Sequence, residues 1–474
     1  MTAEQAKVQV VHCDSYDEER VAAAIPDSVF TQIQPGDKVV LKPNWVFECH
    51  RYMKEDWDYV ITHPSVIGAV LRKVLRRLAG QGRISIMDGP MTDASFEKLI
   101  SRYPVQQWRE LALEEGVLLE IIDLRDSEWL VKNGVIVERK ELPGDPRGKV
   151  LVDLQGEKSE FWGQKKSRRG YYGADYNLSE TNEAHDGQRN LYSVSRTVIE
   201  ADVFINLPKL KTHRKAGITC CLKNLVGINT YKNYLPHHSE GGPGEGGDQF
   251  PRDNVNARLE GPLITFVKQH VLQNQLMARL LGPLKRVALG LFGDSASVVR
   301  SGSWHGNDTL WRTIVDLNKV LLYATPEGEM PGAPGSRRKR YIGIVDAVLA
   351  GEGDGPLAPD PVRMGYLVCG VNPVAIDAAC AGLMGFEPRK IRSLAHAFSA
   401  RAFALCDFGL EQVRVCLEGW EGGIDELPRE RVVPFKAQSA WQGNIEKAQT
   451  AAVVPSGADE RPGEGGAPLP ELER

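Results

Sequence analysis

Short apolar segments alternate with an amphipathic helical pattern along the first half of the chain, and this alternation limits the folds available to it. Residues 7–12 (KVQVVH), 38–41 (KVVL), 83–87 (RISIM) and 120–124 (EIIDL) have the length and composition of buried strands. Residues 63–78 repeat apolar side chains at helical spacing, with basic residues on the opposite face. Strands that alternate with helices in this way form βαβ units. We therefore expect an α/β fold with an open, mostly parallel sheet and flanking helices.

The pattern changes in the middle of the chain and then returns. Between residues 129 and 169, short segments of period two (VIVERK, KVLVDL) are separated by Gly/Pro turns, which predicts a β-hairpin insertion. Residues 202–207, 341–345 and 364–369 are again typical of strands, and we assign the last two to the parallel type. The third leads into a helix that is expected to begin at Asn372-Pro373, because Asn is a strong N-cap and Pro fits the first helical position.

These changes divide the chain into four parts. We expect a first α/β portion (residues 1–128), a β-rich insertion (129–190), a second α/β portion (191–440) with a helical insertion (255–300), and a tail (441–474). The end of the chain lacks apolar periodicity, so we expect this tail to be disordered.

The segment 263–292 is rich in Leu, Ile and Val with scattered basic residues, and it has two interpretations. It could be an interfacial helix pair that contacts lipid. We favour helices that cover the sheet or form a subunit contact, because core-facing helices show the same amphipathic pattern. A stretch of about 18 consecutive apolar residues does not occur, so we expect no membrane span.

Charge and cysteine content exclude several classes of protein. The chain has 58 Lys and Arg against 62 Asp and Glu, a net charge of −4, so the overall basic field of a nucleic-acid-binding protein is absent. The eight cysteines include no C-x-x-C pair, which argues against a zinc ribbon, an iron–sulfur cluster or a thioredoxin-like pair. They are too sparse for a disulfide scaffold, and the N-terminus lacks a signal-peptide pattern, so we expect a cytoplasmic protein.

Cationic side chains gather after the predicted strand 202–207. If the chain stays extended there, alternate residues share one face, and a helix is expected to start near Ala216. Cations at the carboxyl end of a strand, beside a helix N-terminus, suit a phosphate or carboxylate ligand. A solvated basic loop without a ligand is the alternative. The candidate residues for anion binding in this segment are Lys209, Lys211, His213, Lys223 and Asn224.

The same segment contains two adjacent cysteines, Cys220 and Cys221. Adjacent residues point in different directions, which argues against a two-cysteine metal clamp. A single thiol of low pKa near a helix start is the alternative.

Further polar residues follow other predicted strands. Pro43 takes the chain out of the ladder and leaves Lys42 and Asn44 to project into a crevice. Acidic residues at strand ends can hold a hard cation or orient a base, and they can also merely cap turns. The acidic candidates are Asp88, Asp346, Glu352 and, in the first turns of the helix after Asn372, Asp377. The sequence contains no P-loop or G-x-S-x-G motif, and no G-x-G-x-x-G follows the first strands, which disfavours standard P-loop, hydrolase and dinucleotide-binding proteins.

Several motifs occur in the order seen in a bacterial and archaeal family called domain of unknown function 362, and the chain resembles that family over residues 39–388. The motifs are VLKPNW (40–45), THP (62–64), DG (88–89), NLPKLKTH (206–213), LKNLVG (222–227), D…GEG…GP (346–356) and NPVA…D (372–377). Residues 303–318 (SWHGNDTLWRTIVDLN) resemble a segment of one branch. Some members carry an added iron–sulfur module, but this chain lacks its cysteine spacing, so we expect no cluster here.

The resemblance implies that the motif residues line one crevice at the carboxyl ends of the strands. His213, Asp88 and His63 would be the catalytic candidates. Substrate would be held by Lys42, Asn44, Lys209, Lys211, Lys223 and Asn224, and a metal, with Mg²⁺ as the candidate, by Asp346, Glu352 and Asp377.

This set predicts an enzyme that acts on an anionic, phosphorylated or carboxylated small molecule, by metal-assisted group transfer or ligation. Two alternatives remain open. One is racemase- or lyase-type proton abstraction next to a carboxylate, with a lysine or His213 as base. The other is a redox or metal-carrier accessory protein without catalysis.

Overall fold

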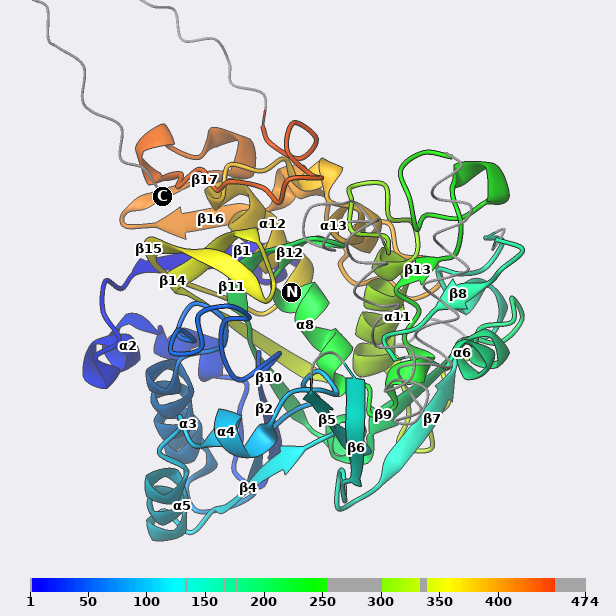
Figure 1. Ribbon diagram of the computed structural model, residues 1–474. Helices are drawn as coiled ribbons and strands as arrows, with labels where there is room; N and C mark the ends of the chain where they lie inside the picture. The colour runs from blue at the N-terminus through cyan, green and yellow to red at the C-terminus, as the bar shows by residue number, and fades with distance from the viewer. Residues whose placement is uncertain are drawn as a thin grey trace, which may run out of the picture.

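The apolar segments of the first half form parallel strands at the centre of the protein. The structure is a computed structural model, and it describes residues 2–132, 135–164, 167–175, 177–253, 301–332 and 339–447. Strands β14 (Arg340–Asp354), β10 (Val203–Leu207), β2 (Lys38–Pro43), β3 (Arg83–Asp88) and β4 (Leu118–Asp123) lie side by side in this order, each parallel to the next. They belong to an 11-stranded sheet, which confirms the predicted open, mostly parallel sheet (Figure 1).

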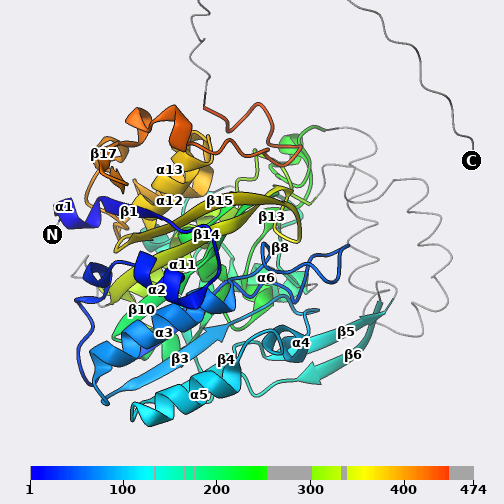
Figure 2. The ribbon, with the colours of Figure 1, turned by 90° about the vertical axis from the view of Figure 1, so that its left-hand side faces the viewer.

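Helices cover both faces of this sheet, because successive residues of a strand point to opposite sides. Val39 and Leu41 of β2 pack with α3 (Pro64–Leu78) and α5 (Val105–Glu114), whereas Val40 belongs to the other core. That second core contains α11 (Leu310–Tyr323) and α12 (Pro373–Leu383) (Figures 1 and 2). The remaining helices described are α1 (Thr2–Gln5), α2 (Glu18–Ala24), α4 (Phe96–Ile100), α6 (Leu178–Ala184), α7 (Arg196–Glu200), α8 (Cys221–Asn224) and α13 (Arg392–Ala397).

Two predicted helix starts are confirmed. His63 is the N-cap of α3, with Pro64 at its first position. Asn372 is the N-cap of α12, where its side-chain oxygen accepts a hydrogen bond of 2.9 Å from the backbone N–H of Val374. In both cases the side chain satisfies a backbone donor that the helix itself leaves unpaired.

The late strands differ from the prediction. β15 (Ala358–Gly370) was assigned to the parallel type, but it runs antiparallel to both β14 and β1 (Lys7–His12). β14 does not end at Asp346 but continues to Asp354, and residues 355–357 join it directly to β15. A connection this short permits only antiparallel pairing, since a parallel crossover needs a dozen or more residues. β16 (Arg414–Leu417) and β17 (Trp420–Gly423) complete this end of the sheet.

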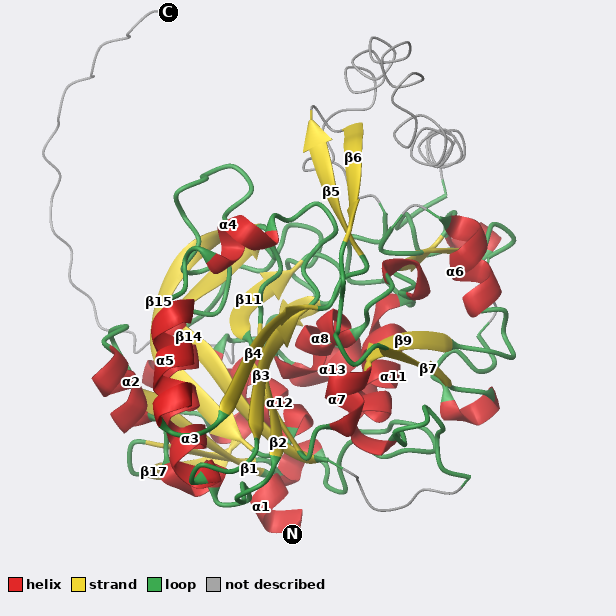
Figure 3. Ribbon diagram, turned by 90° about the horizontal axis from the view of Figure 1, so that it is seen from below, coloured by secondary structure: helices red, strands yellow, loops and turns green. Residues whose placement is uncertain are grey.

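The predicted hairpin insertion is present. β5 (Ser127–Lys132) pairs antiparallel with β6 (Val135–Glu141), and Figure 3 shows this hairpin extending away from the main sheet. The KVLVDL segment does not join it: β7 (Lys149–Asp153) pairs with β9 (Leu191–Ser195). Another two-stranded pair is formed by β8 (Tyr171–Tyr172) and β13 (His238–Ser239). β11 (Lys209–His213) belongs to the main sheet, where it pairs with β14 and with β12 (Gly217–Thr219).

Some expectations concern residues that are not described. The segment 263–292 and the whole expected helical insertion (255–300) lie outside the described residues, as does the part of the expected tail (441–474) beyond residue 447. Residues 441–447 of that tail are described, and Trp441 and Ile445 among them are buried. Among the described helices, none is both long enough and apolar enough to cross a bilayer.

Candidate functional site

A cavity of about 540 Å³ lies beside the carboxyl ends of β2, β3 and β11, where an open α/β sheet binds ligands. The β5–β6 hairpin and the loop after α8 form its other walls. A separate depression of about 420 Å³ lies at the opposite end of the sheet, where Lys7, Gln9 and Trp420 line it. The cavity beside β2 is the candidate site, because it contains part of the residue set predicted from sequence.

The structure divides that predicted set. The cavity is lined by Asn44, Asp88, His213, Lys223 and Asn224. The other predicted residues lie outside its lining: Lys42, His63, Lys209, Lys211, Asp346, Glu352 and Asp377.

Lys42 does not line the cavity itself but contacts two residues that do, Asp88 and Asn224. Its Nζ lies 2.7 Å from Asp88 Oδ1 in a buried ion pair and also donates to Asn224 Oδ1 at 3.2 Å. Asp88 further accepts hydrogen bonds from the backbone N–H groups of Trp45 (2.7 Å) and Gly89 (2.8 Å). With these partners the carboxylate is held in place, so Asp88 is a positioning residue at the cavity wall.

Close packing fixes this arrangement. A Cβ atom at Gly227 would collide with Asp88 Oδ1 and lie 2.8 Å from Lys42 Nζ. Only glycine therefore lets the loop after α8 approach the Lys42–Asp88 pair this closely.

Lys209 and Asp346 form a second buried pair, away from the cavity lining. Their Nζ and Oδ2 atoms lie 2.6 Å apart, and both side chains are fully buried. Asp346 also accepts from the Tyr16 hydroxyl (2.8 Å) and from the backbone N–H of His63 (2.9 Å). His63 stacks on Tyr16, and burial lowers the pKa of His63 to about 4. This network ties β14 and β11 to the start of α3.

Lys209, Lys211 and His213 were expected to share one face of an extended segment, but their side chains reach different parts of the protein. A β-bulge separates Lys209 from Lys211, and Lys211 Nζ donates to the carbonyl of Val60. Burial, together with Lys209 and Lys223, holds the pKa of Lys211 well below its usual value. His213 does reach the cavity, where its Nδ1 accepts from the backbone N–H groups of Lys215 and Ala216, both at 3.1 Å.

That geometry defines the state of His213. A neutral ring whose Nδ1 accepts hydrogen bonds must carry its proton on Nε2. Burial keeps the pKa of His213 well below its usual value, so the ring is neutral at physiological pH. His213 therefore offers a hydrogen-bond donor to the cavity rather than a positive charge.

The helix expected near Ala216 begins later, at Cys221. Gly217–Thr219 forms β12 instead, which pairs back on β11. Lys223 lies in α8, and its Nζ makes no hydrogen bond within the described residues although it lines the cavity. Burial first, and then the charges of Lys232 and Lys42, lower the pKa of Lys223 to about 8.

Lys232 and Asp175 are among the residues of the cavity wall that sequence reasoning missed. Lys232 donates to the carbonyl of Gly89 at 2.7 Å, and burial lowers its pKa to about 8. Asp175 accepts from the Thr92 hydroxyl at 2.6 Å, and burial raises the pKa of Asp175 to about 6. Lys232 begins a short 3-10 helix and Asp175 lies in a loop, and neither follows a predicted strand end or a recognised motif, so the local sequence carried no signal for them.

Two buried oxygens at the cavity are also without a partner. Asn44 Oδ1 and Thr219 Oγ1 accept or donate no hydrogen bond within the described residues, and both residues line the cavity. Buried polar atoms are nearly always paired, so such atoms indicate a place for water or a ligand.

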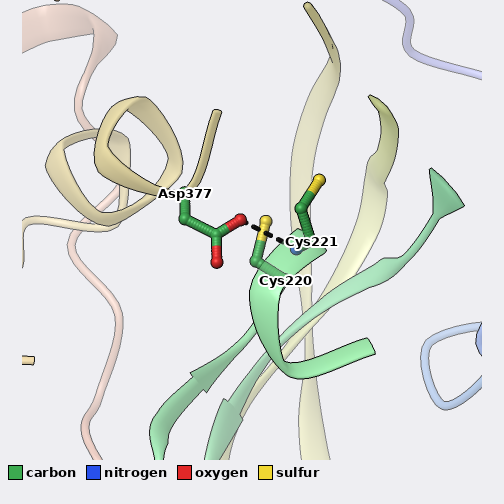
Figure 4. Close-up of side chains that lie close together, drawn as sticks. All are labelled: Cys220, Cys221 and Asp377. Atoms are coloured by element: carbon green, nitrogen blue, oxygen red, sulfur yellow. Dashed lines mark hydrogen bonds between the residues drawn. The ribbon is translucent and has the colours of Figure 1, made fainter. Parts of the chain in front are cut away.

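A potential metal-binding cluster lies apart from this lining. Atoms of Cys220, Cys221 and Asp377 that could ligate a metal lie within 4.8 Å of one another, and all three residues are buried. Figure 4 shows that the two thiols point in different directions, as expected, with Cys220 beside the carboxylate. The carboxylate of Asp377 in α12 reaches the start of α8, so a third group that could ligate a metal lies beside the two thiols.

The chemistry of this cluster differs from the one predicted for Asp377. Its carboxylate accepts from the backbone N–H groups of Cys221 (2.8 Å) and Leu222 (3.1 Å), and burial raises its pKa to about 7. Burial also holds the pKa of both thiols well above the usual value, and a metal must displace those protons to bind. Thiolate ligands suit a soft metal such as zinc rather than Mg²⁺.

The three predicted metal ligands are not brought together. Asp346 is paired with Lys209, and Asp377 lies with the two thiols. Glu352 accepts a hydrogen bond of 2.7 Å from the backbone N–H of Lys436.

Comparison with known proteins gives one firm result. The sequence profile of the family described as domain of unknown function 362 (DUF362) matches residues 39–144 and 172–382. The chain belongs to the DUF362 family. All residues that line the cavity lie within the matched ranges of this DUF362 chain, whereas β7 lies outside them.

Other comparisons are weaker. No curated protein gives a significant match to the sequence. A crystal structure of a protein from Thermotoga maritima is 11% identical, with a TM-score of 0.33, over 78% of this chain and 59% of that protein. The lactate racemase apoprotein from Thermoanaerobacterium thermosaccharolyticum is 11% identical, with a TM-score of 0.31, over 80% of this chain and 57% of that protein. The DUF362 chain thus spans less than two thirds of either protein, and TM-scores this low establish no common function.

Proposed function

We propose that the DUF362 chain is an enzyme that acts on an anionic small molecule, phosphorylated or carboxylated, bound in the cavity of about 540 Å³. The observation that carries this proposal is Lys223, an ammonium group in the cavity lining without a hydrogen-bond partner in the described residues. Lys223 is half-buried, and a cation that is partly withdrawn from water without a counter-ion is costly, so a bound anion removes that cost.

The surroundings of Lys223 favour an anion further. Lys232, Arg51, Arg214 and Lys215 line the same cavity. Three acids, Asp88, Asp93 and Asp175, also line the cavity, but Asp88 is paired with Lys42, and the five Lys and Arg residues outnumber the acids. Thr219 Oγ1 is a further donor for an anionic oxygen.

The proposed enzyme would use these groups in two ways. In group transfer or ligation, Lys223 and Lys232 neutralise the charge that develops on a phosphoryl or carboxyl group, and Mg²⁺ could assist. In proton abstraction next to a carboxylate, a lysine whose pKa is about 8 is available as a base near neutral pH. The opposed pKa shifts of Asp175 and the two lysines support this second class.

Ligand binding tests the proposal first. We expect thermal shifts and calorimetric binding for phosphorylated or carboxylated metabolites, screened with and without Mg²⁺. Lys223→Met should weaken binding at least tenfold, because it removes the unpaired charge. Lys38→Met, which changes an exposed lysine of β2, is the matched control and should bind as wild type. Absence of any anion binding to the wild type, or equal affinity in Lys223→Met, would contradict the proposal.

The reaction class needs a separate measurement. Incorporation of solvent deuterium at the carbon next to the carboxylate of a bound ligand identifies proton abstraction. Release or transfer of phosphate identifies group transfer. Exchange that is lost in both Lys223→Met and Lys232→Met would assign the base to this pair.

The cluster of Cys220, Cys221 and Asp377 supports a second candidate, a metal-carrier protein. Metal analysis and an absorption spectrum of protein purified without oxygen test it. Stoichiometric metal that is lost in Cys220→Ala would support it. A metal-free, colourless protein that still binds anions would leave the enzyme as the proposal.

A further inference from the structure

The lining of the cavity is not uniformly polar. All of its Lys and Arg residues except Arg51 follow β11 in the chain, but one wall is built by the β5–β6 hairpin, which contributes Trp129, Val131 and Ile136. A simple inorganic anion would need only the first wall. The second wall therefore calls for its own explanation.

The hairpin contributes three apolar side chains to the cavity wall. Trp129 and Val131 lie two residues apart on β5, and Val131 faces Ile136 across the hairpin. The Val131 side chain is 36% exposed, although it lines the cavity, whereas Ile136 is 6% exposed. Apolar surface that faces an internal cavity costs free energy until a ligand covers it.

The apolar wall lies close to the charged groups. Thr92 connects the two, because its hydroxyl donates to Asp175 while its carbonyl accepts a hydrogen bond of 2.8 Å from the backbone N–H of Trp129. On the other side, Lys232 donates to Gly89, three positions before Thr92. A single small molecule can therefore contact both the cations and the hairpin.

We infer that the ligand is an amphipathic anion, and this inference rests on the proposed function. Its phosphate or carboxylate lies at Lys223 and Lys232, and an apolar alkyl or aryl body lies against Trp129, Val131 and Ile136. This arrangement is the usual composition of ligand pockets, in which a few polar groups fix the orientation and an apolar wall contributes affinity.

The test is a homologous ligand series of constant charge. Calorimetry with the full chain would compare inorganic phosphate with methyl, butyl and hexyl phosphate, and acetate with pentanoate and heptanoate. We expect affinity to rise along at least one series, by up to about fourfold for each methylene buried. The rise should disappear in the Trp129→Ala/Val131→Ala variant, while binding of the shortest member of the series stays unchanged.

Leu130→Ala is the matched control, because Leu130 lies between the two substituted residues, is 46% exposed and is not among the residues that line the cavity. It should keep the full chain-length dependence. If the double variant does not fold, Val131→Ser alone replaces it, since that side chain is already partly exposed.

The outcomes separate this inference from the proposed function. Equal affinity for short and long members, or a rise that persists unchanged in the hairpin variants, would overturn the inference and leave anion binding at Lys223 standing. Absence of binding for every member would overturn the proposed function and the inference with it.

Discussion

Lys42 and Lys209 were both expected in the crevice, but each forms an ion pair with a buried aspartate. A motif shows that a charged residue follows a strand, but it does not show whether that residue faces a ligand or a counter-charge from another segment. Asp88 lies 46 positions from Lys42, so the pair becomes visible only when the chain is folded. The sequence therefore predicted cations near these strand ends, but it could not show which of them are paired with an acid.

The buried pairs predict a large effect on stability. Lys42→Met leaves the buried Asp88 carboxylate without its paired ammonium group and should destabilise the protein by about 3–5 kcal/mol, as for other broken buried pairs. Chemical denaturation measures this loss. Lys38→Met, at the exposed start of the same strand, should change stability by less than about 0.5 kcal/mol. Equal stability of the two variants would contradict the role assigned to Lys42.

Gly227 predicts an effect on both stability and binding. Its Ala variant forces a Cβ atom onto the Lys42–Asp88 pair, which should cost about 1–3 kcal/mol and displace Asn224 from the cavity wall. Gly332→Ala is the control, because a Cβ there meets nothing within 4 Å. Thermal unfolding and anion affinity, measured on both variants, check these effects. Unchanged stability and affinity in Gly227→Ala would show that the loop has room to move.

The titration of the cavity predicts the pH dependence of anion binding. Lys223 and Lys232, whose pKa values are about 8, lose their positive charge as the pH rises through 8. Asp175, whose pKa is about 6, gains negative charge as the pH rises through 6. Both changes disfavour an anion, so affinity should fall with rising pH, in two steps. Calorimetry from pH 5 to pH 9.5, with a ligand whose charge is constant over that range, measures this profile.

Lys223→Met should reduce the fall in anion affinity near pH 8 and leave the fall near pH 6, because it removes one of the two groups that titrate near pH 8. An affinity that rises with pH would contradict both the placement of the anion and the titration assigned to these residues.

At the scale of elements, helices were predicted better than strand pairing. The starts of α3 and α12 follow from caps that act within a few residues. The direction of β15 depends instead on how long the connection from β14 is, and the sequence alone made residues 351–356 look like a separate acidic turn. The cavity itself could not be predicted, because its walls come from β2, β3, β11, α8 and the β5–β6 hairpin together.

The cap of α12 offers an element-scale prediction. Asn372→Ala removes the acceptor for the Val374 N–H and should cost about 1 kcal/mol, whereas Asn372→Asp keeps an acceptor there and should cost less. Asn372 also donates to the carbonyl of Leu405 at 3.0 Å, and both variants lose that bond. Chemical denaturation of the two variants separates these contributions. Identical losses of stability would show that Asn372 acts through its hydrogen bond to the Leu405 carbonyl rather than as the helix cap.

At the scale of the whole molecule, β1 lies between β15 and β16, and it pairs with both. A ribosome makes β1 about 400 residues before β16, since Lys7 pairs with Arg414. At roughly 5–20 residues per second, β1 waits on the order of 20–80 s for its neighbours. During synthesis β1 lacks its neighbouring strands and exposes unpaired backbone groups. Chaperones or transient contacts within the emerging chain must therefore keep it from pairing with other chains.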